Sequence, residues 1–338
     1  MNGDDIVLDV KDLKVYFHSD AGDARAVDGA SFTIRRGKTL AIVGESGCGK
    51  SVTSYSILRL TQKPGRIAGG SILFRPSKGE PVDIASLDEK SEVLFKIRGG
   101  LISMIFQEPM TALSPVHTVG DQIAEAVMLH QNATKEDAMR RAVEMLSKVG
   151  IPGPEKRIKL YPHEMSGGMR QRVVIAMALA CTPELIIADE PTTALDVTIQ
   201  AQILSLIKEI QKDVGVSVLL ITHDLGVVAQ EADDVAVMYL GRIVEYSSVR
   251  SVLKDARHPY TMGLLKSLPS LAKQGERLPS IAGTVPSLTE IPPGCPFHPR
   301  CPYMKAGVCD IGGAPALDAV ADGHTAACVR AGEIYNER

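Results

Sequence analysis

The sequence contains no tryptophan, and aromatic residues make up only 4% of its 338 residues. Proteins that bind single-stranded nucleic acid without sequence preference stack the bases on aromatic rings, so we expect no surface of this kind. The 37 lysine and arginine residues are matched by 40 aspartate and glutamate residues, giving a net charge of -3. The overall charge therefore provides no attraction for nucleic acid.

Long hydrophobic runs are also missing. The longest apolar run, Val173 to Cys181, has nine residues, whereas a membrane-spanning helix needs about 20. The first five residues, Met1-Asn2-Gly3-Asp4-Asp5, are acidic and lack the basic start and apolar stretch of an export signal. We therefore expect the chain to stay in the cytoplasm and to reach a membrane only through another subunit.

Apolar residues make up 45% of the chain, enough for a large core. From residue 6 to about 257, short apolar strands alternate with helical segments, which predicts an α/β fold with a parallel sheet between helices. Strands are expected at 39–43, 101–106, 184–188, 216–221 and 235–240, and a helix near Lys50. The stretch from about 107 to 180 is mostly helical and is expected to form a subdomain.

The last 81 residues, 258–338, have a different composition. They hold ten of the twenty prolines and no clear periodicity. Such a segment buries little by itself and needs a staple. Four of the six cysteines, Cys295, Cys301, Cys309 and Cys328, lie in the final 44 residues. In a reducing cytoplasm, clustered thiols favour metal ligation over disulfides.

A glycine-rich loop follows the strand at 39–43. The run Gly44-Glu45-Ser46-Gly47-Cys48-Gly49-Lys50-Ser51 has the spacing of a P-loop, whose backbone N–H groups and helix N-terminus bind phosphates. Lys50 would contact the β- and γ-phosphates, and the Ser51 hydroxyl would bind Mg²⁺.

An acidic pair ends a second buried strand, Leu185-Ile186-Ile187-Ala188-Asp189-Glu190. Asp189 would hold Mg²⁺ through its water shell, and Glu190 would be the general base that polarises the attacking water. The alternative is a surface acidic pair at the end of a core strand, which the P-loop beside it disfavours.

Three further sequences complete a pattern. Gln107 lies in Phe106-Gln107-Glu108-Pro109, the run Met165-Ser166-Gly167-Gly168-Met169 lies between the two halves of the nucleotide site, and His223 follows the strand at 216–221. In this order the motifs resemble those of ABC-type ATPases over nearly the whole chain. The resemblance implies a P-loop ABC-type nucleotide-binding domain at 6–257, with a RecA-like core, an antiparallel β subdomain and a helical subdomain at about 107–180.

The resemblance assigns a role to each motif. Gln107 would touch Mg²⁺ and report to a membrane subunit, His223 would sense the γ-phosphate, and the serine-glycine-glycine run would touch the nucleotide of a different ATPase domain. Thr193-Ala194-Leu195-Asp196 resembles the D-loop, which contacts the opposite domain. Phe17 falls where the family stacks an aromatic ring on adenine, although Tyr16 or a plain core role remains open. Cofactor contacts are expected at Phe17, Gly44, Ser46, Gly47, Cys48, Gly49, Lys50, Ser51, Val52, Gln107, Ser166, Gly167, Gly168, Asp189 and Asp196.

Other phrases resemble the dipeptide/oligopeptide importer subfamily. They are Phe106 to Thr111, Tyr161-Pro162-His163-Glu164, His258-Pro259-Tyr260-Thr261 and the tail from Gly294 to Pro302. The subfamily implies an ATPase that drives peptide import at the cytoplasmic face of the inner membrane. Its partners would be a second ATPase subunit, identical or paralogous, two integral-membrane permease subunits and, indirectly, an extracytoplasmic solute-binding protein. The alternative is a soluble ABC ATPase acting on nucleic acid or ribosomes, for which the chain lacks a second ATPase half, long coiled coils or basic arms.

The cysteine-rich tail also has a counterpart in this subfamily. Some related subunits are described as holding a 4Fe–4S cluster, and four thiolates without a regular pattern can ligate one. The spacing is not that of a zinc finger. Zinc, with help from His298 or His324, and unligated thiols remain alternatives.

Two departures from the family pattern are visible. Met165 and Met169 stand where leucine and glutamine are common, and Cys48 stands where serine is frequent. The Cys48 side chain would be a small filler, or backbone amides would lower its pKa and make it oxidisable.

Overall fold

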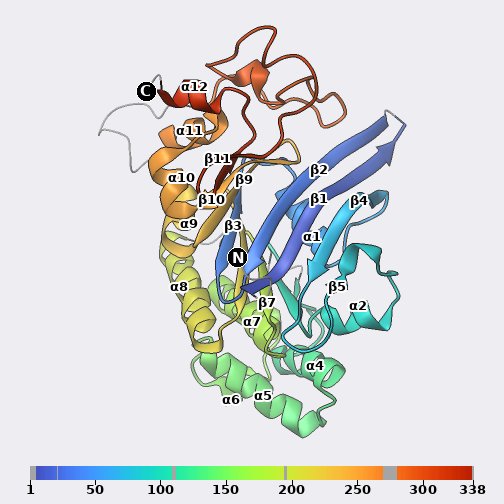
Figure 1. Cartoon of the computed structure of the whole chain (residues 1–338). Coiled ribbons are helices and arrows are strands. Elements are labelled where there is room, and N and C mark those ends of the chain that lie inside the picture. Colours follow the sequence, from blue (N-terminus) through green and yellow to red (C-terminus); the bar gives the residue numbers. More distant parts are fainter. Residues whose placement is uncertain (1–4, 21, 109–111, 194–195, 269–279, 337–338) are drawn as a thin grey trace.

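The computed structural model describes residues 5–20, 22–108, 112–193, 196–268 and 280–336. Pro109, Met110 and Thr111, and Ala194 and Leu195 of the expected D-loop, lie outside these ranges. Two sheets organise the fold, with helices packed around the larger one (Figure 1). No helix among the described residues is long and apolar enough to cross a membrane.

The larger sheet has the strand order β11-β12-β10-β9-β3-β8-β7-β6 within the described residues. Strands β9, β3, β8, β7 and β6 pair in parallel, whereas β10, β12 and β11 continue the sheet antiparallel. All five parallel strands are buried along their whole length, which explains their continuous apolar runs. The bounds are β3 Thr39–Val43, β6 Ile102–Ile105, β7 Leu185–Asp189, β8 Ser217–Thr222, β9 Asp234–Tyr239, β10 Arg242–Ser248, β11 Asp318–Ala321 and β12 His324–Ala326. The five predicted strands are confirmed to within a residue or two at each end.

The smaller sheet is antiparallel, in the order β2-β1-β4-β5. Its strands are β1 Ile6–Ser19, β2 Gly22–Arg35, β4 Gly65–Phe74 and β5 Val82–Asp83. Its inner face and one face of the larger sheet share a core that includes Leu8, Val27, Ile72, Ile42 and Ile187. The expected antiparallel β subdomain is thus confirmed.

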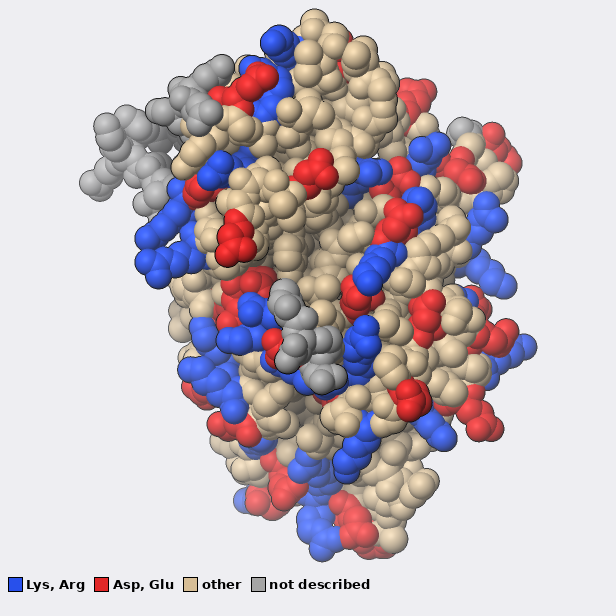
Figure 2. All heavy atoms as spheres, viewed as in Figure 1, with Lys and Arg blue, Asp and Glu red and all other residues tan. Residues whose placement is uncertain are grey.

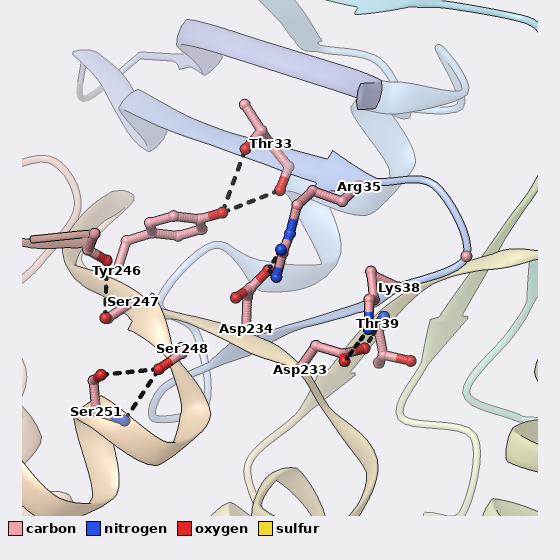
Figure 3. A network of polar contacts seen from close by, with 12 residues as sticks. Thr33, Arg35, Lys38, Thr39, Asp233, Asp234, Tyr246, Ser247, Ser248 and Ser251 are labelled. Atoms are coloured by element: carbon pink, nitrogen blue, oxygen red, sulfur yellow. Dashed lines mark hydrogen bonds and ion pairs between the residues drawn. The ribbon is translucent and has the colours of Figure 1, made fainter. Parts of the chain in front are cut away.

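A polar network also joins the two sheets (Figure 3). Arg35 at the end of β2 donates two hydrogen bonds to Asp234 of β9, and the Tyr246 hydroxyl of β10 donates to the Thr33 carbonyl oxygen of β2. Beside them Asp233 accepts from Lys38 and from the backbone N–H of Thr39, where β3 begins. These bonds fix the orientation of the smaller sheet against the larger.

The helices flank both sheets. They are α1 Lys50–Ile57, α2 Glu92–Ile97, α4 Val119–Gln131, α5 Lys135–Lys148, α6 Pro154–Arg157, α7 Gly167–Leu179, α8 Val197–Val214, α9 Leu225–Glu231, α10 Val249–Asp255, α11 Pro259–Lys266 and α12 Ala331–Asn336, with short 3-10 turns at Ile84–Ser86, Pro162–Glu164 and His298–Arg300. Helix α5 begins at Thr134 as its N-cap, because the Thr134 side chain accepts from the Asp137 backbone N–H. Its inner face, including Ala138, Ala142 and Leu146, is buried. Helices α4, α5 and α6 form one end of the molecule (Figure 1).

The segment after residue 257 forms the opposite end of the molecule (Figure 1). The expectation that it buries little is wrong. Tyr260 and Phe297 are fully buried in the core cluster that holds Val43 and Tyr239, and β12 pairs with β10. His324 on β12 also bonds the fully buried Glu245 carboxylate of β10 at 2.7 Å. The extension is therefore held by aromatic packing, sheet pairing and a buried side-chain hydrogen bond before any metal is considered.

Candidate active site

The predicted P-loop connects β3 to α1 and lies against two other backbone segments. A Cβ atom at Gly44 would be 2.2 Å from the Met238 carbonyl oxygen, and one at Gly49, which has a φ of +105°, would be 2.2 Å from the Ala26 carbonyl oxygen. Only glycine fits these positions. Helix α1 then starts at Lys50 without a side-chain cap, so its first backbone N–H groups remain available for a phosphate.

Lys50 is held inside this loop. Its Nζ donates to the carbonyl oxygens of Gly44 at 2.9 Å and Glu45 at 3.0 Å. These acceptors keep an almost fully buried ammonium group satisfied. An arriving phosphate would find the charge already positioned.

Cys48 is a residue of the same loop, and its side chain is buried. Burial raises the pKa of its thiol, with the Lys50 charge opposing that shift. The idea that backbone amides make it an easily oxidised thiolate is therefore wrong, and its role as a small filler is supported.

Asp189, at the end of β7, is brought next to the P-loop helix. Its Oδ1 accepts from the Ser51 hydroxyl at 3.1 Å and its Oδ2 from the Ser54 hydroxyl at 3.4 Å. The carboxyl is only 1% exposed, and burial raises its pKa. A buried carboxylate beside a hydroxyl is a donor set that suits Mg²⁺, which prefers hard oxygen ligands. The two residues therefore fit the predicted metal position.

Glu190 is the meeting point of three side chains. Its Oε2 accepts from Thr193 Oγ1 at 2.8 Å and Gln107 Nε2 at 3.2 Å, and its Oε1 lies 3.4 Å from His223 Nδ1. Its backbone has a φ of +45°, an uncommon conformation for a residue with a side chain. Such strain occurs at functional sites where neighbours over-determine the geometry. The structure thus brings together the predicted base, the glutamine and the histidine.

Thr193 is a partner of Glu190 that the sequence pattern did not single out. In the sequence, Thr193 is only the first residue of the expected D-loop. Because it lies three residues after Glu190, in the turn where its N–H donates to the Glu190 carbonyl oxygen, its hydroxyl can reach back to the carboxylate.

The serine-glycine-glycine run forms the start of α7. The Ser166 hydroxyl accepts from the Met169 backbone N–H as the N-cap, at a long distance of 3.4 Å. A Cβ at Gly167 would meet nothing within 4 Å, whereas one at Gly168 would press on Ile199 at 3.2 Å. Met165 is buried in the core. The described hydrogen bonds of Ser166 stay within α7, so the structure does not join this run to the P-loop of the same chain.

Asp196 and Phe17 have structural contacts of their own. Asp196 is the N-cap of α8, accepting from the Ile199 backbone N–H. Phe17 is half-buried and packs against Gly65, where a Cβ would approach its ring to 2.6 Å. Tyr16 is engaged elsewhere, since its hydroxyl donates to Asp28 at 2.6 Å. Val52 packs partly buried on the same core as Phe17. Nucleotide contacts of Phe17, Val52 and Asp196 stay predictions.

The P-loop also contacts the C-terminal extension. Arg300 donates to both carboxylate oxygens of Glu45, at 2.7 and 3.0 Å, and the Glu45 backbone N–H donates to the Tyr260 hydroxyl at 2.9 Å. The hydrogen bonds to Glu45 raise the pKa of Arg300. No local signal in the sequence predicts this contact, because 255 residues separate Glu45 from Arg300.

The four cysteines of the extension line one small cavity of about 20 Å³, together with His258, Phe297 and Tyr303. Burial raises the pKa of Cys295, Cys301 and Cys328 each to about 11. In the described residues, no three His, Cys, Asp or Glu side chains are placed to hold one metal ion. The cysteines are thus brought together, but the donor set of a single zinc ion is not formed.

Taken together, the fold and the site define the class as a P-loop nucleotide-binding protein in which three side chains contact the Glu190 carboxylate. Comparisons with known proteins narrow the class. Residues 27–193 match the ABC transporter family, and residues 244–309 match the oligopeptide/dipeptide transporter C-terminal region. A probable peptide ABC transporter ATP-binding protein of Sinorhizobium fredii is 52% identical over 334 residues, 98% of this chain and 97% of that protein. A dipeptide transport ATP-binding protein of Bacillus subtilis is 53% identical, over 95% of this chain and 94% of that one.

Solved structures give the same result. A dimeric structure of a bacterial ABC transporter cassette matches with a TM-score of 0.62 and 27% identity, covering 72% of this chain and 99% of that one. A dimeric post-hydrolysis state of an ATP-binding cassette, bound to ADP and Pi, matches with the same TM-score and 26% identity. The chain belongs to the family of ABC transporter ATP-binding proteins, in the group that carries the oligopeptide/dipeptide transporter C-terminal region.

Proposed function

We propose that this chain is the ATP-hydrolysing, energy-coupling subunit of a peptide-type ABC importer. The observation that carries the proposal is the convergence of Lys50, Ser51 and Asp189 with the Gln107–Glu190–His223 group, in a chain about half identical to peptide-transport ATP-binding proteins along nearly its full length.

The residues divide the hydrolysis between them. The loop amides, the α1 N-terminus and Lys50 bind the phosphates of ATP. Glu190, held by Thr193 and Gln107, accepts the proton of the attacking water as general base. His223 lies close enough to the same carboxylate to change its position when a γ-phosphate is present. Ser51, Asp189 and Gln107 are the residues that would hold Mg²⁺, which would supply positive charge to the phosphates.

A second ATPase subunit is part of the proposal. The Ser166-Gly167-Gly168 run opens to solvent at Gly167, and its helix N-terminus suits a phosphate. Because the described hydrogen bonds of Ser166 stay within α7, a nucleotide would contact this run in a partner chain, identical or paralogous. Asp196, the last residue of the expected D-loop, would lie at the same interface.

The permease subunits have a candidate docking groove. A cavity of about 280 Å³ is lined by residues of β6, α4 and α7 and of the segments that follow α1 and β6, among them Leu60, Met104, Phe106, Ala126 and Met177. Phe106 directly precedes Gln107, so a segment seated in the groove would bear on the residue that holds Glu190. We propose that a helix of a membrane permease occupies it, which places this chain at the cytoplasmic face of the inner membrane. A solute-binding protein would act through the permeases.

The experiment that tests the function is Glu190→Gln. Glutamine keeps the shape of the side chain but lacks the carboxylate that would act as the base. We expect ATP hydrolysis to fall by about 10²- to 10⁴-fold, ATP binding to persist, and a closed ATP-loaded dimer to accumulate in size-exclusion chromatography. Glu144→Gln, on the exposed face of α5, is the matched control and should hydrolyse at the wild-type rate. Normal hydrolysis by Glu190→Gln would contradict the assignment.

The alternative, a soluble ATPase acting on nucleic acid or ribosomes, is not favoured. On the face shown in Figure 2, Lys and Arg are interspersed with Asp and Glu, without a continuous basic stripe. Affinity purification of the full chain from cells separates the two ideas. Recovery with integral membrane proteins supports the transporter subunit, and recovery with ribosomes or DNA contradicts it.

For the extension we propose, as a finer assignment, that Cys295, Cys301, Cys309 and Cys328 hold a 4Fe–4S cluster. Four thiols line one cavity without forming a single-ion site among the described residues. Four thiolates without a regular sequence pattern can ligate one such cluster.

Anaerobic purification tests this assignment. We expect about four irons and four sulfides per chain, as one cluster with Cys₄ ligation requires. Cys301→Ser should lose this iron and sulfide. Zinc in place of iron and sulfide would contradict the assignment.

We also propose a functional division near residue 257, with the ATPase domain at 6–257 and the extension at 258–338.

A further inference from the structure

A second cavity lies in the C-terminal extension, and none of the four cysteines lines it. Its volume is about 220 Å³. Helix α11 forms one wall, and the segments that carry Ile281 and Phe297 contribute the others. Met262 and Phe297 are 4% and 1% exposed, so these walls are packed into the body of the extension. The cavity is therefore part of the fold and not a gap between surface side chains.

Gly263 sets the spacing between two of these walls. It lies inside α11, where glycine weakens a helix relative to alanine. A Cβ atom at this position would be 2.9 Å from Ile281 Cγ1, and both residues line the cavity. The close approach of Ile281 to the helix thus requires glycine here.

The polar residues give the cavity a positive character. Lys266 and Arg300 are cations, and no aspartate or glutamate is among the described residues that line the cavity. Lys266 is exposed, and its ammonium group has no ion-pair partner in the described part of the chain. The Arg300 side chain is 3% exposed, and its described hydrogen bonds, to Glu45 and to a carbonyl oxygen, use three of its five N–H groups. An anion that enters the cavity would meet two cations and no competing carboxylate of the lining.

Size and lining together define the class of ligand. An apolar cavity of about 150 Å³ holds benzene, so this one has room for a molecule of about eight to ten non-hydrogen atoms. Apolar walls favour an apolar body, and the cations favour a negative charge. A doubly charged phosphate would lose more hydration than a carboxylate on entering such walls.

We propose that this cavity binds a small organic monocarboxylate. Its apolar body lies against Met262 and Phe297, and its carboxylate lies at Lys266 and Arg300. The site goes beyond the ATPase function proposed above and does not depend on it.

Arg300 connects this site to the P-loop. Its guanidinium group donates to both carboxylate oxygens of Glu45, at 2.7 and 3.0 Å. A carboxylate bound in the cavity shares the guanidinium group with Glu45, which weakens the restraint on the P-loop. The bound carboxylate therefore lowers the affinity for ATP, and ATP lowers the affinity for the carboxylate by the same factor.

The probe is 4-methylpentanoate, and its neutral amide, 4-methylpentanamide, is the control of the same shape. Each is titrated into the full-length protein by isothermal titration calorimetry. We expect saturable binding of the carboxylate with a Kd on the order of 1 mM, and binding of the amide that is about tenfold weaker. No saturable binding of the carboxylate, or equal binding of the amide, overturns the site.

A pair of lysine substitutions tests the place of binding. Lys266→Gln should weaken binding of 4-methylpentanoate about fivefold, because one charged hydrogen-bond donor is lost at an exposed position. Lys254→Gln is the matched control, since both are exposed lysines in the last turn of consecutive helices, α10 and α11. The control should bind like the wild type. Unchanged binding by Lys266→Gln, or equal weakening in both variants, overturns the site.

The link to the P-loop is measured with a non-hydrolysable ATP analogue. Saturating 4-methylpentanoate should weaken binding of the analogue about fivefold, as expected for the loss of one hydrogen-bonded anchor. An unchanged affinity for the analogue overturns the link. These readouts do not depend on hydrolysis, so a failure of the cavity site and a failure of the Glu190 assignment are distinguishable.

Discussion

The ion pair between Glu45 and Arg300 gives the sharpest prediction about stability. The Arg300 side chain is 3% exposed and the Glu45 side chain is 31% exposed. Arg300 is further fixed by a hydrogen bond to the Ala282 carbonyl oxygen and lies 5.8 Å from the centroid of the Tyr239 ring. Glu45→Ala therefore leaves a buried guanidinium without its carboxylate.

The size of the effect follows from this burial. Removing one partner of a buried pair costs about 3–5 kcal/mol, and water reaching the Glu45 side reduces the expected loss to about 2 kcal/mol. In thermal unfolding of a chain of this size, 338 residues, this corresponds to a fall of about 3 °C. Because Glu45 is also part of the P-loop, we expect ATP binding to weaken about fivefold, the equivalent of losing one hydrogen-bonded anchor of about 1 kcal/mol.

A double-mutant cycle tests the reasoning. Arg300→Met removes the buried charge, so Glu45→Ala should cost much less in that background than in the wild type. Glu144→Ala removes the carboxylate of an exposed pair with Arg141 of similar length, 2.8 Å, and should change the midpoint little. Strictly additive losses in the cycle, or an effect at Glu144 as large as that at Glu45, would refute the argument.

Two further predictions concern the nucleotide site. Thr193→Val keeps the shape of the side chain but removes the 2.8 Å hydrogen bond to Glu190. We expect kcat for ATP hydrolysis to fall about tenfold with KM nearly unchanged. An unchanged kcat would show that Thr193 does not orient the base. Gly49→Ala places a Cβ 2.2 Å from the Ala26 carbonyl oxygen, whereas the Cβ of Gly47→Ala meets open space. Both glycines have a positive φ, so each substitution costs about 1 kcal/mol in backbone strain. We expect the thermal midpoint to fall further for Gly49→Ala than for Gly47→Ala, and equal falls would contradict the close approach.

The nucleotide site was largely predictable because its parts are local. The P-loop and the acidic strand each place their chemistry within a few consecutive residues at the C-terminal end of a buried strand. Parallel pairing of β3, β8 and β7 then brings these ends to one edge of the sheet. Once the strands are identified, the proximity of Ser51 to Asp189 follows from topology.

The extension was less predictable for the opposite reason. Its proline-rich sequence has no periodicity, yet Tyr260 and Phe297 are buried against Tyr239, a residue of the central sheet. The β10–β12 pairing and the Glu245–His324 hydrogen bond join positions about 80 residues apart. A pattern search within a window of ten or fifteen residues cannot find partners that only the folded sheet brings together.

Glu45 combines a position that the local sequence predicts with contacts that only the fold brings together. Its position in the P-loop is readable from the glycine spacing, but its partners, Arg300 and Tyr260, come from the extension. Arg300 directly precedes Cys301 in the chain, and the Tyr260 backbone bonds to His258 beside the thiol cavity. The residues that restrain the P-loop are thus the neighbours of those that line the cavity. An extension attached in this way is structurally part of the ATP site, and removing it would leave the buried face of Tyr239 and the carboxylate of Glu45 without their partners.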